Sequence, residues 1–302
     1  MLLPFMAMAF PERTVRIIIP VAAGSGPDVQ LRKLSILLSE KWKQPVIVEN
    51  RPSGAGAVAM QEILKSSPDG HVFGMFTLGD IVAFPLLYEN NLVTQLQPIA
   101  PFFDADLVLF VRTDIKNLNQ LIEEIKKQPT FGSWGIGSAS HIAGAQFATI
   151  LKLPGISHAP YNHGNQLYAD TSRGDLTYGF TSLSTGDPMY RAGKITYLAI
   201  AANKRDPKFP DLPTVKELAG VPLVSHSWLA FFGHANMKKQ SLQQLQQDLK
   251  DVISDPQMKA FMEEKFYIPM HDITPAAFKE VIEQDKEMYK RAIKDYNIKL
   301  NQ

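Results

Sequence analysis

The chain of 302 residues carries 31 Lys and Arg against 30 Asp and Glu, and 45% of its residues are hydrophobic. This near-neutral balance, with no basic run longer than two residues, excludes a typical nucleic-acid-binding protein. The apolar fraction is too high for a disordered chain, and no apolar stretch approaches the roughly 20 residues that span a membrane. The length predicts about two globular domains.

The first nine residues resemble part of an export signal. The apolar residues from Leu2 to Met6 precede Ala7-Met8-Ala9, the A-x-A pattern that signal peptidases cleave, but the usual basic segment is absent. We interpret residues 1–9 either as the trimmed end of a signal peptide or as an unstructured terminus. The chain has no cysteine, which excludes disulfides, Cys-ligated zinc and a cysteine-linked lipid anchor.

Strands and helices alternate from residue 15 onward. A β-branched run predicts a strand at 15–19, and apolar residues spaced three and four apart predict a helix that begins at Pro27. Further elements are expected as a strand at 46–48, a helix at 57–65 and a strand at 72–77. A strand, a helix and a second strand in about 35 residues form a βαβ unit, which indicates a parallel sheet.

The alternation continues and then gives way to helices. Expected elements are strands at 107–111, 131–134, 176–180, 197–201 and 228–232, and helices at 118–127 and 141–151. The last 60 residues are expected to be helical, with Leu242, Leu245, Leu249 and Val252 on one face.

No flexible linker separates two domains, so the chain is expected to cross between them in ordered strands, near residues 102–108 and 227–231. This organisation predicts one domain from residues 10–105 plus 229–302. Residues 106–228 are predicted to form the other domain.

Two strand–helix junctions, residues 22–28 and 135–141, combine glycines with hydroxyl side chains. Backbone N–H groups and the helix dipole attract an anion at such a position. Each loop alone is also compatible with a plain turn. Because two such junctions fall on different predicted domains, they predict a site that holds an anion from both sides. Asp28 is expected chiefly to stabilise the start of its helix.

Neither junction matches a nucleotide fingerprint, so no cofactor is predicted. The dinucleotide pattern lacks its third glycine, because Val29 and Ser140 stand at that position, and no Walker A sequence follows either turn. The seven histidines include no His-x3-His pair, and the Gly-x-Ser-x-Gly elbow is absent. We therefore expect no metal site and no catalytic residues.

Together these motifs resemble the extracytoplasmic solute receptors of tripartite tricarboxylate transporters, the Bug-type receptors. The resemblance runs from about Pro11 to the C-terminus. It is carried by Ile17-Ile18-Ile19-Pro20 with Ala23-Gly24 and Asp28, Gln44 to Pro52, Gly54-Ala55-Gly56, Pro68-Asp69-Gly70, Gly132-Ser133, Gly135, Gly137-Ser138, His141, Ala143-Gly144, His158, Pro160-Tyr161, Ala192-Gly193-Lys194 and Pro213-Thr214.

The resemblance implies a type II periplasmic-binding-protein fold, or Venus flytrap, in which two α/β domains with mostly parallel sheets clamp a ligand. It implies a monomeric, non-enzymatic periplasmic receptor. Its expected ligand is a small carboxylate: a di- or tricarboxylate, an aromatic acid or an acidic amino acid. The expected partner is an inner-membrane permease. The implied ligand-binding residues are Ala23, Gly24, Ser25, Gly26, Asp28, Thr77, Gly137, Ser138, His141, Tyr161, Thr181 and Ser182.

The sequence also departs from the family's usual pattern. Ser25 stands where glycine is usual, Pro27 where a hydroxyl residue is usual, and the segments 78–80 and 229–234 differ as well. These differences leave the identity of the acid open. Arg51 is expected to form a structural ion pair with Glu49 or Asp28. Two other functions stay open: a ligand sensor for a signalling partner, and a biosynthetic enzyme on the same fold.

Overall fold

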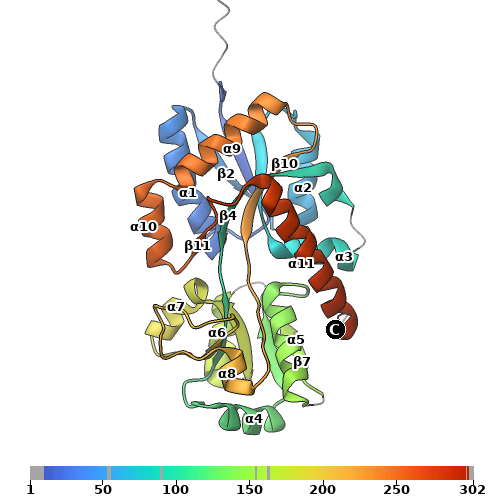
Figure 1. Ribbon diagram of the computed structural model, residues 1–302, viewed down its shortest axis with the longest axis vertical. Helices are drawn as coiled ribbons and strands as arrows, with labels where there is room; N and C mark the ends of the chain where they lie inside the picture. Colours follow the sequence, from blue (N-terminus) through green and yellow to red (C-terminus); the bar gives the residue numbers. More distant parts are fainter. Residues whose placement is uncertain are drawn as a thin grey trace, which may run out of the picture.

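The computed structural model describes residues 10–52, 56–88, 91–153, 155–161, 164–296 and 298. Residues 1–9, where a signal-peptide remnant is expected, lie outside the described residues. The described chain forms two lobes, each built on one β-sheet (Figure 1). Within this part of the chain, every helix is too short or too polar to cross a membrane.

The first lobe holds a six-stranded sheet in the order β11-β4-β10-β3-β1-β2. Its strands are β1 (Val15–Ile19), β2 (Val46–Asn50), β3 (Val72–Thr77), β4 (Leu96–Asp104), β10 (Leu229–His234) and β11 (Ile268–Pro269). Its helices are α1 (Gly26–Trp42), α2 (Ala57–Lys65), the π-helix η2 (Gly79–Ala83), α3 (Phe84–Tyr88), the 3-10 helix η3 (Leu92–Gln95), α9 (Lys239–Ile253), α10 (Pro256–Glu264) and α11 (Pro275–Asp295).

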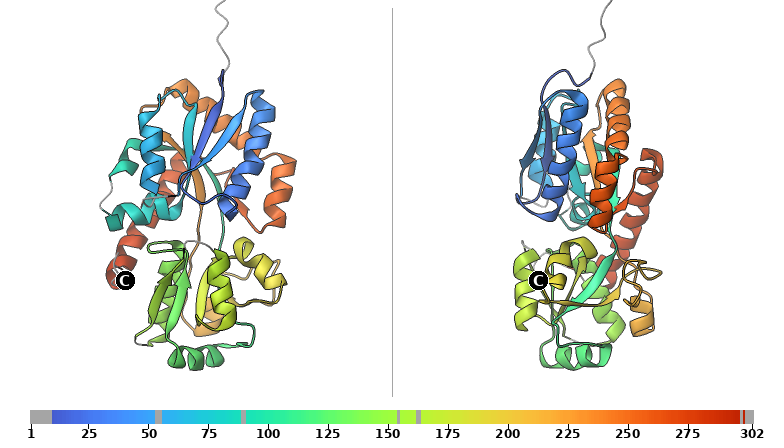
Figure 2. Two further views of the ribbon diagram at one scale, coloured as in Figure 1. Left: turned by 180° about the vertical axis from the view of Figure 1, so that it is seen from behind. Right: turned by 90° about the vertical axis from the view of Figure 1, so that its left-hand side faces the viewer.

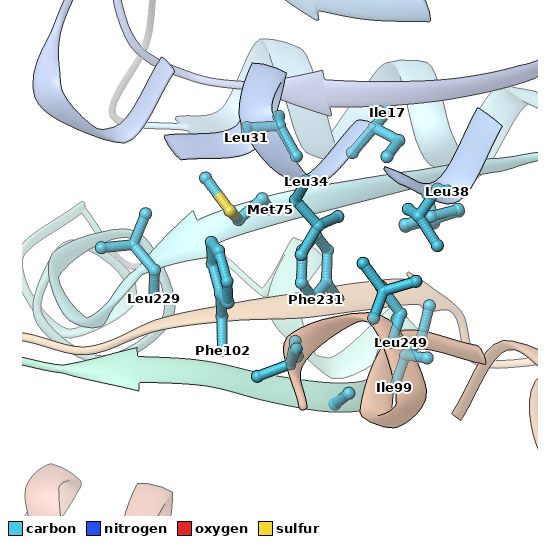
Figure 3. Close-up of a cluster of buried hydrophobic side chains, with 14 of the residues drawn as sticks. Ile17, Leu31, Leu34, Leu38, Met75, Ile99, Phe102, Leu229, Phe231 and Leu249 are labelled. Carbon is cyan, nitrogen blue, oxygen red and sulfur yellow. The ribbon is translucent and has the colours of Figure 1, made fainter. Parts of the chain in front are cut away.

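Helices cover both faces of this sheet, so its central strands are apolar on both sides. Ile17 packs with α1, α9 and α10, whereas its neighbour Ile18 packs with α2 and α11 on the opposite face. The alternation follows from the two-residue period of a strand, and burial of both faces accounts for the continuous apolar run at 15–19. Figure 3 shows the first of these clusters, in which Phe102 and Phe231 lie beneath the side chains of α1.

The second lobe holds a five-stranded sheet in the order β7-β6-β8-β5-β9. Its strands are β5 (Leu107–Val111), β6 (Thr130–Ser133), β7 (Ser157–Pro160), β8 (Tyr178–Ser182) and β9 (Thr196–Ile200). Its helices are α4 (Leu118–Lys127), α5 (Ala139–Leu151), α6 (Gly164–Arg173), α7 (Leu183–Arg191) and α8 (Val215–Ala219). Two apolar clusters, one on each face of the sheet, form the core of this lobe.

Both sheets are mixed, which corrects the expectation that they are mostly parallel. The βαβ units do give parallel pairs, as in β1 with β2 and β6 with β7. However, β10 runs antiparallel to β3 and β4, and β5 runs antiparallel to β8 and β9. The reason is connectivity: β4 leads out of the first lobe and β10 leads back, so the two strands lie side by side in opposite directions.

The chain passes between the lobes twice, after β4 and before β10 (Figure 2). The two crossing segments are paired by an antiparallel bridge between Asp106 and His226, and Ser227 N–H donates to the Ala105 carbonyl over 3.0 Å. The first crossing lies between the end of β4 at Asp104 and the start of β5 at Leu107. The C-terminal helices α9 to α11 all return to the first lobe.

We predict that Phe231→Ala destabilises the first lobe by about 3–5 kcal/mol, because it empties a site between two packed rings. The Phe231 ring lies 6.0 Å from that of Phe73 and 5.6 Å from that of Phe102, and it is fully buried. Urea unfolding followed by circular dichroism measures the change. Val221→Ala at an exposed position is the control, and a loss no larger than that of the control would contradict this packing.

Candidate ligand-binding site

The first predicted junction is a tight loop held by Asp28. Gly24 has φ +80°, a conformation that side-chain-bearing residues rarely adopt. Its N–H donates to Asp28 Oδ2 over 2.8 Å, Arg32 Nε donates to the same oxygen over 2.9 Å, and Asn50 Nδ2 donates to Oδ1 over 2.8 Å. Burial pushes the pKa of Asp28 upward, but these hydrogen bonds outweigh it and hold the pKa below its ordinary value. Asp28 therefore shapes the loop that precedes α1.

Ser25 and Gly26 place this loop at the boundary between the lobes. Ser25 precedes the first turn of α1 without capping it, and its hydroxyl oxygen is buried with no hydrogen-bond partner among the described residues. A Cβ on Gly26 would lie 3.8 Å from Thr185 Oγ1 of α7. The N-terminus of α1 in the first lobe therefore faces the N-terminal turn of α7 in the second.

The second predicted junction joins β6 to α5. Gly135 and Gly137 both have positive φ, at +114° and +80°. Ser138 caps α5 by accepting the His141 N–H over 3.2 Å, and its hydroxyl donates to the Gly135 carbonyl over 2.7 Å. The Ser138 hydroxyl is thus engaged in forming the loop. The helix-start backbone N–H groups remain the donors that this junction can offer an anion.

His141 lies beneath this junction as a neutral ring. Its Nδ1 accepts the Gly137 N–H over 3.0 Å, and its ring stacks on His158 with a centroid distance of 3.7 Å and an interplanar angle of 9°. His158 Nε2 lies 2.7 Å from Ser133 Oγ. Burial lowers the pKa of His141 to about 4, and burial with the neighbouring His141 lowers the pKa of His158 to about 3. Both rings support the loop and add no positive charge near neutral pH.

Thr181 and Ser182 belong to a third strand–helix junction, between β8 and α7. Ser182 caps α7 by accepting the Thr185 N–H over 3.2 Å, and its Oγ lies 2.8 Å from Thr185 Oγ1. Thr181 Oγ1 lies 2.6 Å from the hydroxyl of Tyr168 inside the lobe. The structure therefore brings a third helix start to the boundary between the lobes. The resemblance named these two residues, but the glycine criterion missed the junction because it contains no glycine.

Thr77, at the end of β3, is engaged with an acid that sequence reasoning did not include. Both the N–H and the hydroxyl of Thr77 donate to Asp80 Oδ2, over 2.8 and 2.7 Å. Burial raises the pKa of Asp80 to about 6 against the lowering effect of these bonds. The intervening Gly79 lies against the second junction, since a Cβ there would be 3.9 Å from the Ser138 Cα.

Two further residues are held within their own lobes. The Tyr161 hydroxyl donates to Asp170 Oδ2 of α6 over 2.6 Å, so its proton is engaged inside the second lobe. Arg51 Nη2 forms an ion pair with Glu49 Oε2 at 2.8 Å, which confirms the structural role expected for it. The described residues contain no cluster of His, Asp or Glu suited to a metal ion.

Gln30 is a polar residue at the boundary that the sequence patterns did not single out. It is buried in α1, its Oε1 has no hydrogen-bond partner among the described residues, and its Nε2 donates to the hydroxyl of Tyr267. A Cβ on Gly26 would lie 3.9 Å from its Nε2. Its position in the sequence could have indicated this role, because Gln30 lies one turn after Gly26 on a helix whose first turn is a candidate site.

Comparison with known sequences identifies the family of this chain. A family model described as the tripartite tricarboxylate transporter family receptor matches residues 31–298. A UPF0065 protein of Bordetella pertussis is 31% identical over 267 residues, which are 85% of this chain and 81% of that protein. The protein BugT of the same organism is 26% identical over 236 residues, with coverages of 75% and 72%.

Two solved structures share the fold. One, described as a periplasmic transporter, has a TM-score of 0.86 at 26% identity and covers 97% of this chain and 100% of its own. The other, an R. palustris protein with adipate, has a TM-score of 0.87 at 22% identity, with coverages of 96% and 99%. The expected family resemblance and periplasmic-binding-protein fold are confirmed.

We predict that the stacked histidines make the protein sensitive to acid. Since the folded state lowers their pKa below the ordinary 6.5, their contribution to stability is complete above pH 6.5. It declines as the pH falls toward about 4 for His141 and about 3 for His158. Between pH 7.5 and 4.5, His158→Gln should lose about 1–3 kcal/mol less unfolding free energy than the parent. Urea unfolding at both pH values tests this, with His234→Gln as the control. Equal pH dependence of parent and His158→Gln would overturn it.

Proposed function

The chain belongs to the tripartite tricarboxylate transporter receptor family, and from this premise we propose that it captures a small carboxylate between its two lobes. The family consists of receptors rather than enzymes, so the biosynthetic-enzyme alternative is set aside. We further propose that the protein acts in the periplasm and passes its ligand to a membrane permease. The division into residues 10–105 plus 229–302 and residues 106–228 is part of the same proposal.

The observation that carries this proposal is the meeting of helix starts from the two lobes. The start of α1 faces that of α7, since a Cβ on Gly26 would lie 3.8 Å from Thr185 Oγ1, and the loop that begins α5 lies against Gly79. Each helix start presents backbone N–H groups without intrahelical partners and the positive end of a helix dipole. The nearby histidines are neutral, so an anion here is held by backbone donors.

These contacts separate the proposed ligand-binding residues into those that donate hydrogen bonds to the ligand and those that hold the loops in place. Backbone N–H groups in the first turns of α1, α5 and α7 supply the donors, next to Ala23, Gly26 and Ser182. The N–H groups of Gly24, Ser25, Gly137 and Ser138 already bond within their own loops, so these residues set the shape of the site. The unpartnered Ser25 hydroxyl adds a side-chain donor within the first junction. Asp28, Thr77, His141, Tyr161 and Thr181 hold the loops and walls through the hydrogen bonds described above. Ligand identity then depends on how these donors are spaced rather than on one charged side chain.

A ligand sensor remains the second candidate, because the same capture of a ligand could report to a signalling partner instead of a permease. The family assignment favours transport. A pull-down with the ligand-bound protein separates the two, since a permease subunit supports transport and a signalling protein supports sensing.

We predict that dicarboxylates stabilise the protein against heat. The adipate in the R. palustris neighbour makes adipate the first probe, followed by citrate, benzoate and glutamate. A ligand at 100 times its dissociation constant should add about 2.7 kcal/mol to the unfolding free energy. Thermal-shift assays and calorimetry measure it. Adipamide, in which neutral amides replace both carboxylates, is the matched control and should not bind. Failure of every acid to bind would defeat the proposed function.

The first junction can be tested by a change in backbone conformation. Gly24→Val should weaken binding about tenfold to 150-fold, because valine resists φ +80° and displaces at least one donor to a charged ligand. Gly220→Val is the matched control: Gly220 also has positive φ, +76°, and open space around its Cβ position, but it ends α8. Unchanged binding in Gly24→Val would show that this loop does not hold the carboxylate.

A further inference from the structure

The chain bends sharply where α10 ends, at a residue whose conformation is unfavourable. Phe266 has φ +58°, the left-handed region that glycine usually occupies after a helix. Tyr267 N–H bonds to the Met262 carbonyl over 3.0 Å, and Phe266 N–H bonds to the Glu263 carbonyl over 3.3 Å. This pair of bonds is the Schellman arrangement. A phenylalanine at the glycine position calls for a compensating contact.

That contact lies in the opposite lobe. The Phe266 ring packs 5.2 Å from the ring of Phe209 and joins the apolar cluster of the second lobe. Lys208 Nζ lies 5.3 Å from the centre of the Phe266 ring and donates to the Glu263 carbonyl over 2.5 Å. The left-handed bend therefore projects an aromatic ring from the first lobe onto the second, and a lysine of the second lobe binds the exposed end of α10.

Tyr267, the next residue, contacts side chains that lie close to the proposed ligand-binding site. Its ring lies 4.2 Å from that of Phe103, near the end of β4 where the chain leaves the first lobe. Its hydroxyl accepts a hydrogen bond from Gln30 of α1. It also interacts with the side chain of Ser184 in the first turn of α7. Ser184 is adjacent to Thr185, the residue that faces Gly26. One tyrosine thus connects the two helix starts that meet across the boundary.

We propose that Phe266 and Tyr267, here called the clasp, are positioning residues that hold the start of α7 against the start of α1 and so set the closed geometry in which the ligand is bound. This inference rests on the proposed carboxylate-binding function. Two crossing strands leave the angle between the lobes adjustable, so contacts remote from the ligand can change the population of the closed form. A smaller closed population lowers apparent affinity in proportion.

The most informative variant is Phe266→Gly. Glycine suits the left-handed bend, so the variant should fold and unfold at a temperature equal to or above that of the parent. It removes the ring from the second lobe, however, and should weaken binding of the best acid about tenfold. Lys43→Gly is the matched control, because Lys43 also has positive φ, +55°, ends α1 and is exposed. It should gain similar stability without losing affinity.

Tyr267→Phe provides a second and milder variant, which removes the hydroxyl link to Gln30 and Ser184 while keeping the ring on Phe103. It should weaken binding several-fold. Small-angle scattering of ligand-free protein should show a larger radius of gyration for both clasp variants than for Lys43→Gly. Calorimetry measures the affinity and scattering measures the radius of gyration. Replacing a residue that is needed only for folding would change neither quantity in the folded protein.

The outcomes separate this inference from the proposed function. If the parent binds an acid and both clasp variants bind it as tightly as Lys43→Gly with unchanged radii, the clasp is wrong and the receptor function stands. If the parent binds no carboxylate, the receptor function fails, and unchanged radii in the ligand-free variants would still refute the clasp. Should Phe266→Gly fail to fold, the affinity and radius of Tyr267→Phe decide.

Discussion

The two-strand connection between the lobes is the constraint on which the rest of this structure depends. It is held on the side of the first lobe by a partly buried cluster around His226, whose ring nitrogens lie 2.7 Å from Asp104 and 3.2 Å from Asp285. Burial alone would lower the pKa of His226, but these carboxylates raise it to about 10. Trp228 donates to Asp285 over 2.8 Å. Charge pairing thus anchors one crossing segment to both β4 and α11.

This anchoring makes the position of the second lobe depend on what lies at the boundary. The sheets themselves are locked by apolar clusters on both faces. The lobes meet through polar helix starts, a few aromatic contacts, and Ile136 and Ile142 of the second lobe, which pack into the cluster of α2 and α11. Backbone donors suit this place, because a helix start costs little to leave open to water and binds an anion strongly once water is excluded. The same boundary can therefore serve an open and a closed arrangement.

Two acidic side chains, those of Asp28 and Asp80, shape the loops at the boundary between the lobes. Asp28 directs both carboxylate oxygens to Gly24, Asn50 and Arg32, so its charge is neutralised within the first lobe. Asp80 is buried under the second junction, and its raised pKa reflects the cost of that burial. Its hydrogen bonds with Thr77 fix the end of β3 beside Ser138. Each acid therefore holds a loop in place through hydrogen bonds to its backbone or to neighbouring side chains.

Local patterns in the sequence were sufficient for the elements with strong periodicity. The bounds of β1, α2, β3, β5 and α4 match those predicted, because β-branched runs and amphipathic spacing determine such elements locally. Strand β4 was not predicted, since Pro98 and Pro101 interrupt it and lack ladder donors. They are accommodated where β4 pairs with β10 and the register shifts.

The chain alone also determined that two glycine junctions begin helices, since the positive φ at Gly24, Gly135 and Gly137 requires that residue type. Only the tertiary structure decided which groups meet there. It brought α7 to the site without a glycine signal, engaged the Ser138 and Thr77 hydroxyls in their own loops, and joined Gln30 to Tyr267 from 237 positions away. Periodicity reports the environment of a residue along its own helix or strand, whereas contacts between lobes depend on the angle at which two crossing strands set them.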